Sequence, residues 1–135
     1  MAQQFNPYLT FDGTCAEAMD FYAAALGGTV RSMTFRESGL DVDGVMHAAL
    51  ETPTGFHLFA SDTVAGMGAP LVVGNNVQVS LSGDEPDALR GYWAALSEGG
   101  TVVMPLERQM WGDDYGLLAD KFGILWHVNI SVTAS

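Results

Sequence analysis

The sequence predicts an α+β fold built from two tandem strand–helix–strand–strand–strand (βαβββ) modules, and three observations support this. The tetrapeptide Gly-Gly-Thr-Val occurs twice, at residues 27–30 and 99–102. Each copy follows a segment with apolar residues at helical spacing, and each of those segments follows a short strand-like stretch. Self-similarity at a fixed spacing indicates a repeated structural unit. The two copies lie about seventy residues apart, too far for a solenoid repeat, and we interpret them as a duplication within one domain.

The first module is predicted to span residues 5–62. Apolar and polar residues alternate over residues 5–11, which is typical of a half-buried strand. Thr14 followed by Glu17 matches a capping box, in which two side chains satisfy free N–H groups at a helix start. The elements expected next are a helix over 16–26, a strand over 29–35, a polar loop over 37–44, and a hairpin of strands 45–51 and 56–61.

The second module is predicted to span residues 76–131, after a glycine- and proline-containing linker over residues 63–75. Pro86 suits the first turn of a helix, where a missing N–H costs nothing. The elements expected are a strand over 77–81, a helix over 86–98, and strands over 101–104, 116–119 and 124–130. The tail, residues 131–135, is expected to fray. Setting Gly55 against Gly123 superposes the second hairpins and places Phe59 on His127 and His47 on Tyr115.

Composition excludes several classes of partner. A chain of 135 residues is expected to form one domain, residues 1–135, and its net charge of −11 argues against nucleic acid and anionic membranes. No segment is long and apolar enough to span a membrane, and the first residues do not resemble a signal peptide, so a cytoplasmic location is expected. Cys15 is the only cysteine, and we interpret it as a small buried residue.

An ordered set of motifs resembles the vicinal oxygen chelate superfamily, which includes glyoxalases, bleomycin-resistance proteins and extradiol dioxygenases. The similarity covers nearly the whole chain and is strongest to the PhnB-like branch. It rests on these segments: Asn6-Pro7-Tyr8-Leu9, Phe21-Tyr22, Val45-Met46-His47-Ala48, Met104-Pro105-Leu106, Trp111-Gly112-Asp113, Gly116, Asp120-Lys121-Phe122-Gly123, Trp126 and Asn129.

The resemblance implies that each module curls its sheet into a half-barrel around a pocket, with the helices outside. Family members commonly hold a divalent metal there, on ligands from the first and last strands of each module. At those places this chain has His127, His57 and Gln78 as candidate ligands, and Zn²⁺, Ni²⁺, Mn²⁺ or Fe²⁺ as candidate ions. None of these places holds a carboxylate. Because neutral amides bind such ions poorly, the site is degenerate, and the extradiol dioxygenase activity is poorly supported.

Each candidate residue also has a structural interpretation. His127 is either a metal ligand or a hydrogen-bonded core histidine, since neutral histidine is often buried. His47 either lines the pocket or packs in the fold, and His57 is either a ligand or a half-exposed residue beside a turn. Trp111 would cover the pocket as part of a lid fixed by Asp113, plug the open end of the half-barrel, or lie at a dimer seam.

Two functions follow from the resemblance, and no catalytic residue is assigned in either. The first is a glyoxalase-like, metal-dependent lyase or isomerase, in which His127 and His57 hold the ion as a Lewis acid. The second is a metal-independent, ligand-sequestering protein of the bleomycin-resistance type. Its small-molecule ligand would lie among Trp111, Tyr8, Phe59 and Tyr115, with no cofactor. A homodimer is expected in both cases.

Overall fold

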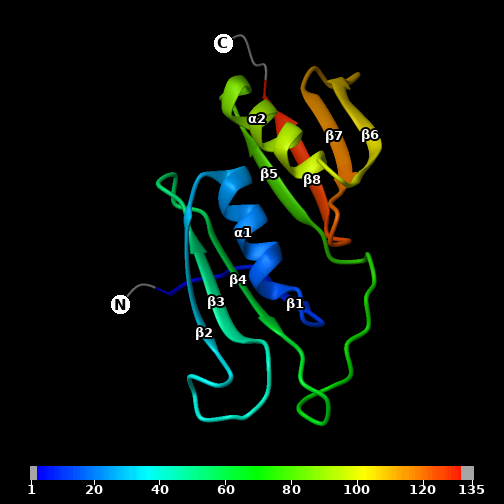
Figure 1. Ribbon diagram of the computed structural model, residues 1–135. Helices are drawn as coiled ribbons and strands as arrows, with labels where there is room; N and C mark the ends of the chain where they lie inside the picture. Colours follow the sequence, from blue (N-terminus) through cyan, green and yellow to red (C-terminus); the bar gives the residue numbers. More distant parts are fainter. Residues whose placement is uncertain (1–2, 132–135) are drawn as a thin grey trace. The chain divides into compact units, whose positions relative to one another are not determined.

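The computed structural model describes residues 3–131. The chain divides between Val73 and Gly74 into two compact units. Residues 1–2 and the predicted frayed tail at 132–135 lie outside the described part. Each unit contains one four-stranded mixed sheet with one helix packed on it (Figure 1). The predicted α+β fold of two βαβββ modules is therefore confirmed.

The first unit contains five elements in the predicted order. Its strand order is β1-β4-β3-β2, in which β1 runs parallel to β4 and the other neighbours are antiparallel. The elements are β1 (Tyr8–Phe11), α1 (Cys15–Leu26), β2 (Thr29–Thr34), β3 (Val45–Glu51) and β4 (His57–Asp62).

The second unit repeats this arrangement. Its strand order is β5-β8-β7-β6, and β5 runs parallel to β8. The elements are β5 (Val79–Gly83), α2 (Pro86–Ser97), β6 (Thr101–Arg108), β7 (Asp114–Ala119) and β8 (Leu125–Ile130). Equivalent backbone bonds close both parallel pairs, because Thr63 N donates to Phe11 O and Ser131 N donates to Gly83 O, each at 2.7 Å.

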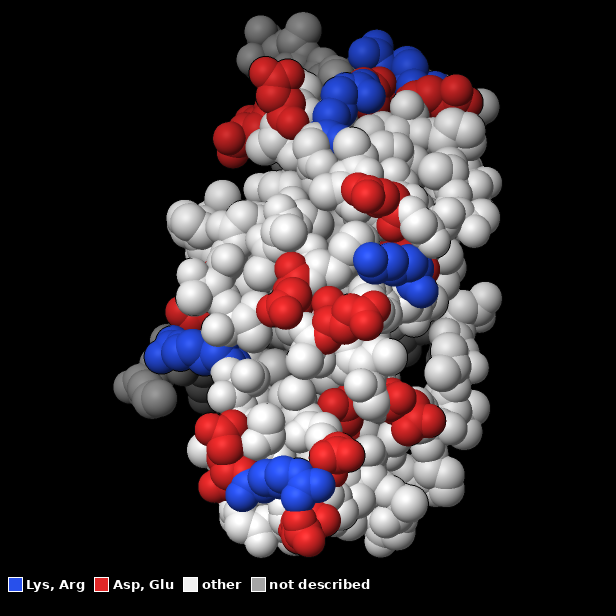
Figure 2. All heavy atoms as spheres, in the orientation of Figure 1, with Lys and Arg blue, Asp and Glu red and all other residues white. Residues whose placement is uncertain are grey.

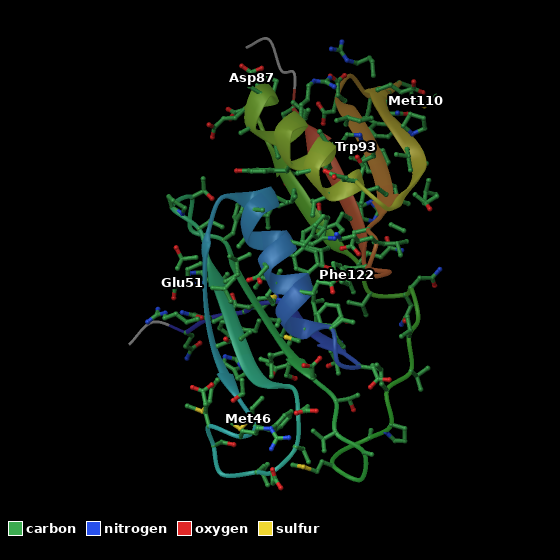
Figure 3. All side chains as sticks on the ribbon, in the orientation of Figure 1. Met46, Glu51, Asp87, Trp93, Met110 and Phe122 are labelled. Atoms are coloured by element: carbon green, nitrogen blue, oxygen red, sulfur yellow. The ribbon has the colours of Figure 1, made fainter. Side chains whose placement is uncertain are left out.

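The core of each unit lies between its helix and one face of its sheet. Alternate residues of β4 and β8 are buried, as expected for strands with one covered face. In the first unit the buried residues of α1 recur at helical spacing and pack on β2, β3 and β4. In the second, Leu89 and Leu96 of α2 are buried, and the Trp93 ring lies against Gly116, where an added Cβ would meet it at 2.6 Å (Figure 3).

The Gly-Gly-Thr-Val repeat has the same two roles in both units. The first glycine, Gly27 or Gly99, follows the helix with a positive φ of 80° or 75°, which side chains rarely adopt. The second glycine lies against the backbone of the neighbouring strand. A Cβ on Gly28 would lie 2.5 Å from Glu51 O, and one on Gly100 would overlap Ala119 O. The repeat therefore allows each helix to turn directly into a tightly packed strand.

The predicted capping box at the start of α1 is wrong. Thr14 makes no side-chain capping bond; instead, Asp62 of β4 accepts hydrogen bonds from Gly13 N and Cys15 N, both at 2.9 Å. The second oxygen of Asp62 accepts one from Val45 N at 2.8 Å. A carboxylate 47 residues away in the sequence thus satisfies N–H groups at the helix start, and it also ties α1 to β3.

Two strand boundaries differ from the prediction by at least three residues. The first strand begins at Tyr8 rather than residue 5, and Phe5 is exposed. Strand β6 continues from Thr101 through Pro105 to Arg108, beyond the predicted end at 104. Pro105 has no backbone N–H to donate. Because β6 is the edge strand of its sheet, Pro105 removes no obligatory hydrogen bond between strands there.

Candidate functional site

The predicted site residues of β4 and β8 lie on the sheet faces that point away from the helices. In β4, His57, Phe59 and Ser61 alternate with buried residues, and in β8, Leu125, His127 and Asn129 do the same. These side chains are half-buried, whereas their neighbours pack against α1 or α2. Each unit thus has one partly exposed sheet face available for contacts with a ligand.

In the first unit the structure brings together Tyr8, His47 and Phe59. The ring centroids of Tyr8 and His47 lie 5.9 Å apart, and those of His47 and Phe59 lie 5.3 Å apart. Tyr8 Oη lies 3.5 Å from His47 Nδ1, and Tyr8 is 52% exposed. This aromatic cluster offers apolar ring surface beside one weakly engaged imidazole.

In the second unit the structure brings together Gln78, Tyr115 and His127. Tyr115 Oη lies 2.6 Å from His127 Nδ1, and His127 Nε2 contacts Gln78 Oε1. Because Gln78 Oε1 can only accept, His127 carries its proton on Nε2, so Nδ1 accepts the phenolic proton of Tyr115. The three side chains form one hydrogen-bonded row from the segment before β5 across β8 to β7.

Trp111 and Asp113 belong to the turn between β6 and β7. Gln109 N donates to Asp113 O at 2.9 Å, and Gly112 N donates to Gln109 O at 3.0 Å. Asn129 Nδ2 donates to Asp113 Oδ2 at 3.0 Å, so a strand residue anchors the turn. Trp111 is 58% exposed, and its ring lies 5.9 Å from that of Tyr115. The turn therefore holds an exposed indole beside the hydrogen-bonded row.

The donor chemistry of this row does not fit a resident divalent metal. Both ring nitrogens of His127 are already in contact with neighbours, and the other donors are a phenol and an amide. Within residues 3–131, no three His, Cys, Asp or Glu side chains are grouped closely enough to hold an ion. His57, the remaining predicted ligand, lies half-buried at the start of β4 in the other unit.

Cys15 and Arg36 are two ionisable groups outside the predicted site residues. Burial, together with the charge of Asp62, raises the pKa of the Cys15 thiol to about 12, so the thiol is protonated at neutral pH and is a poor nucleophile. Acidic side chains are spread over the face shown in Figure 2. One basic side chain on the surface, Arg36, is paired with Asp41 and Asp43.

The comparisons with known proteins agree with this architecture. A model of the Glyoxalase/Bleomycin resistance protein/Dioxygenase superfamily matches residues 4–128. The chain belongs to this superfamily. A protein of Mycobacterium bovis, Mb0911c, is 35% identical over 127 residues, which cover 90% of this chain and 78% of that protein.

Solved structures include close matches to the fold. The Pseudomonas aeruginosa protein PA1353 shares 36% sequence identity with a TM-score of 0.82, over 96% of this chain and 98% of that chain. A PhnB protein from Bacillus cereus shares 20% identity with a TM-score of 0.77, over 96% and 100% of the two chains. The second likeness concerns the fold alone. The resemblance to glyoxalase-family and PhnB-like proteins seen in the sequence is thus confirmed.

The family motif around residues 120–126 has a structural role that the sequence did not indicate. Asp120 Oδ1 accepts from Phe122 N and Ile124 N, and Asp120 Oδ2 accepts from Trp126 Nε1 at 2.8 Å. The motif therefore builds the β7–β8 turn on the helix-covered side of the sheet.

Within residues 3–131, no helix is long and apolar enough to cross a membrane.

Proposed function

We propose that this protein binds a small, oxygen-bearing aromatic ligand without a metal, at the second-unit face made by Trp111, Tyr115, His127 and Gln78. One observation carries the proposal: an exposed indole lies beside a hydrogen-bonded row in which His127 has no nitrogen free for an ion. Ligand sites typically combine such apolar surface with a few placed polar groups.

The row suits a ligand with hydrogen-bonding oxygens. The phenol of Tyr115 accepts as well as donates, and the amide of Gln78 retains its N–H₂ donors although one already bonds Asn75 O at 2.8 Å. Trp111 supplies flat apolar area, and a stacked aromatic pair adds about 0.5–1.5 kcal/mol beyond its buried area. Tyr8 and Phe59 offer comparable ring surface in the first unit.

Fluorescence with EDTA present tests the proposal directly. Catechol and phenol serve as probes, because the first has two vicinal oxygens and the second has one. We expect saturable quenching, since Trp111 is the exposed member of three tryptophans and Trp126 is 1% exposed. Catechol should bind more tightly than phenol, by about fivefold for one additional net hydrogen bond.

Variants identify the residues that bind. Tyr115→Phe should weaken catechol binding by about tenfold or less, and Trp111→Ala should abolish the saturable quenching because it removes the reporting indole. His57→Ala should leave the signal of the second unit unchanged. Quenching that rises linearly without saturation would show collisional quenching and exclude this site. Quenching of equal size in Trp111→Phe and in a control variant of a buried tryptophan would exclude it in the same way.

A metal-dependent lyase or isomerase is the second candidate, and one observation favours it. Gln78 and His127, two of the three predicted ligands, are in contact. An ion would have to compete with Gln78 for His127 Nε2. Elemental analysis of untagged protein, followed by titration with Zn²⁺, Ni²⁺ and Mn²⁺, decides between the candidates. One equivalent of ion that is lost in His127→Ala would favour the enzyme, and retained stoichiometric metal in that variant would rule out this ligand set.

A further inference from the structure

The segment predicted as a linker forms part of a cavity in the first unit. Residues 63–69 leave β4 and turn back on themselves, with an isolated bridge between Val64 and Met67. Together with the strands, this segment lines an open cavity of about 280 Å³. A volume of that size is near the lower end for small-molecule sites in proteins.

The floor of the cavity is the sheet face opposite α1. Thr10 of β1 and Ser61 of β4 are paired in register, and both line the cavity. Met46 joins them because β3 has a bulge: Met33 pairs with His47 and Thr34 with Val45, which leaves Met46 as the extra residue. Figure 3 shows Met46 in this part of the first unit.

The remaining wall is apolar. Phe35 lies at the end of β2, and the turn contributes Val64, Met67 and Ala69. Two methionines, one from the sheet and one from the turn, thus face the same space. Methionine side chains adapt to different shapes and contact aromatic rings favourably, by about 0.3–1.5 kcal/mol.

Three hydroxyl groups in the lining are available to a ligand. Among the described residues, the side chains of Thr10, Ser61 and Thr63 make no hydrogen bond to another group. They are not fully buried, so water satisfies them when the cavity is empty of other molecules. A ligand oxygen that replaces this water would keep the hydrogen bonds and bury its apolar part.

The charge in the lining disfavours ionic ligands. Asp62 is the one charged residue among the lining residues, and its oxygens already accept three backbone N–H groups, so no cation is offered a free carboxylate. No Lys, Arg or His lines the cavity, so an anion has no partner and meets the field of Asp62. The site therefore suits an uncharged molecule.

We propose that this cavity is a second binding site, for an uncharged monocyclic aromatic molecule that carries one hydroxyl group. The ring lies between Met46 and Met67, and the hydroxyl bonds to the Thr10 and Ser61 side chains. Every residue that lines this cavity belongs to the first unit, whereas the residues of the Trp111 face belong to the second.

Methyl NMR on protein labelled at the methionine methyl groups tests the proposal, with p-cresol and toluene as matched probes. Met46 and Met67 report on the cavity, Met110 next to Trp111 reports on the second-unit face, and the buried Met19 reports on the core. We expect p-cresol to shift Met46 and Met67 saturably. It should bind about fivefold more tightly than toluene, which lacks the hydroxyl group.

Four variants localise the effect. Thr10→Val and Ser61→Ala should remove the preference for p-cresol over toluene but keep the apolar binding, and Met67→Ala, in the exposed turn, should weaken the binding of both probes. Trp111→Ala should leave the Met46 and Met67 shifts intact. The Met19 resonance shows whether each variant is folded.

Three results would overturn this site: no saturable shift of Met46 or Met67, equal affinity for the two probes, or shifts confined to Met110. The last would retain the proposed function while removing the second site. Saturable shifts at Met46 and Met67 without any at Met110 would retain the second site and count against the proposed function.

Discussion

The two units share a backbone plan but use different polar groups to hold it together. The β3–β4 pairing of Ala48 with Ala60 corresponds to the β7–β8 pairing of Gly116 with Val128, under the alignment that sets Gly55 on Gly123. The glycine pair after each helix also has the same geometry in both. Backbone geometry and apolar periodicity thus survive where the polar side chains have changed.

The turns before the last strands show this difference most clearly. In the first unit Thr52 Oγ1 accepts from Phe56 N at 3.0 Å, and in the second Asp120 takes the same place with three N–H donors. Both residues also pair through the backbone with the residue four positions later. A neutral hydroxyl suffices for the turn itself, and the carboxylate additionally fixes Trp126.

The candidate ligand faces differ in a related way. The position of His47 in the first unit holds Tyr115 in the second, and that of Phe59 holds His127. Both faces thus pair a tyrosine with a histidine, but the contact is 3.5 Å between Tyr8 and His47 and 2.6 Å between Tyr115 and His127. The second face is the more preorganised for polar recognition, which is why the proposed function is placed there.

Replacement of the second glycine of each repeat should have the largest effect on stability. Gly28→Ala and Gly100→Ala each force a Cβ against backbone atoms that cannot move aside, and overpacking of this kind costs about 1–3 kcal/mol or more. Gly27→Ala meets no atom within 4 Å and should cost about 1 kcal/mol, from its positive φ alone. Urea unfolding measures all three variants.

The location of the tryptophans makes this test specific for each unit. All three tryptophans lie in the second unit, so tryptophan fluorescence measures the unfolding of Gly100→Ala. Circular dichroism measures the unfolding of Gly28→Ala as well. A larger loss for Gly27→Ala than for Gly28→Ala would contradict the packing explanation.

Exchange of the turn residues should have the next largest effect. Asp120→Asn places an amide N–H₂ against at least one N–H donor, and we expect a loss of about 2–3 kcal/mol, because charge-assisted bonds are lost and a buried donor is left unpaired. Thr52→Val removes two neutral hydrogen bonds, one from Phe56 N and one with Thr54 Oγ1, and should cost about 1–2 kcal/mol. Urea midpoints provide the comparison, and equal losses would mean that the two turns are equivalent.

The features predicted correctly are those encoded by nearby residues. The glycines that follow the two helices, Gly27 and Gly99, and the alternation in β4 and β8 can be read from a few neighbouring positions, and these features predicted the fold. Gln78 and His127 are in contact although they lie 49 residues apart in the sequence, and only the family resemblance placed them together.

The features missed depend on tertiary position. The carboxylate that caps α1 comes from Asp62, while Thr14 and Glu17 matched the local motif and do not form it. The extension of β6 through Pro105 depends on its being an edge strand, which the local sequence does not show. Gly66 and Gly68 indicated only turns, so the cavity beneath residues 63–69 was missed.

Loss of the Asp62 carboxylate should destabilise α1 but not α2. In Asp62→Asn, the start of α1 loses charge-assisted bonds, and we expect a cost of about 1–2 kcal/mol, reduced because Gly13 is exposed to water. The first turn of α2 has no side-chain capping bond to lose. Hydrogen exchange should therefore show weaker protection of the Cys15 and Ala18 amides and no change in α2. Equal changes in both helices would indicate a global effect instead.

The smallest expected effect is the pH dependence of the ion pairs around Asp114, which exist only in the second unit. Hydrogen bonding from Arg108, with a further contribution from Arg90 of α2, holds the pKa of the Asp114 carboxyl below its usual range. Because the folded pKa is the lower one, the stabilisation is complete above the ordinary value of about 3.9 and is lost as the pH falls through the folded value.

Asp114→Asn should therefore lower Tm by a few degrees at most near pH 7, and the difference should shrink as the pH falls below about 4. The effect is small because the two arginine side chains are 48% and 62% exposed, and salt should reduce it further. Arg108→Gln should cause more of this loss than Arg90→Gln, because the Arg108 bond contributes most to the pKa shift. A Tm difference that persists unchanged at pH 3 would show that Asp114 acts through packing against β8 rather than through its charge.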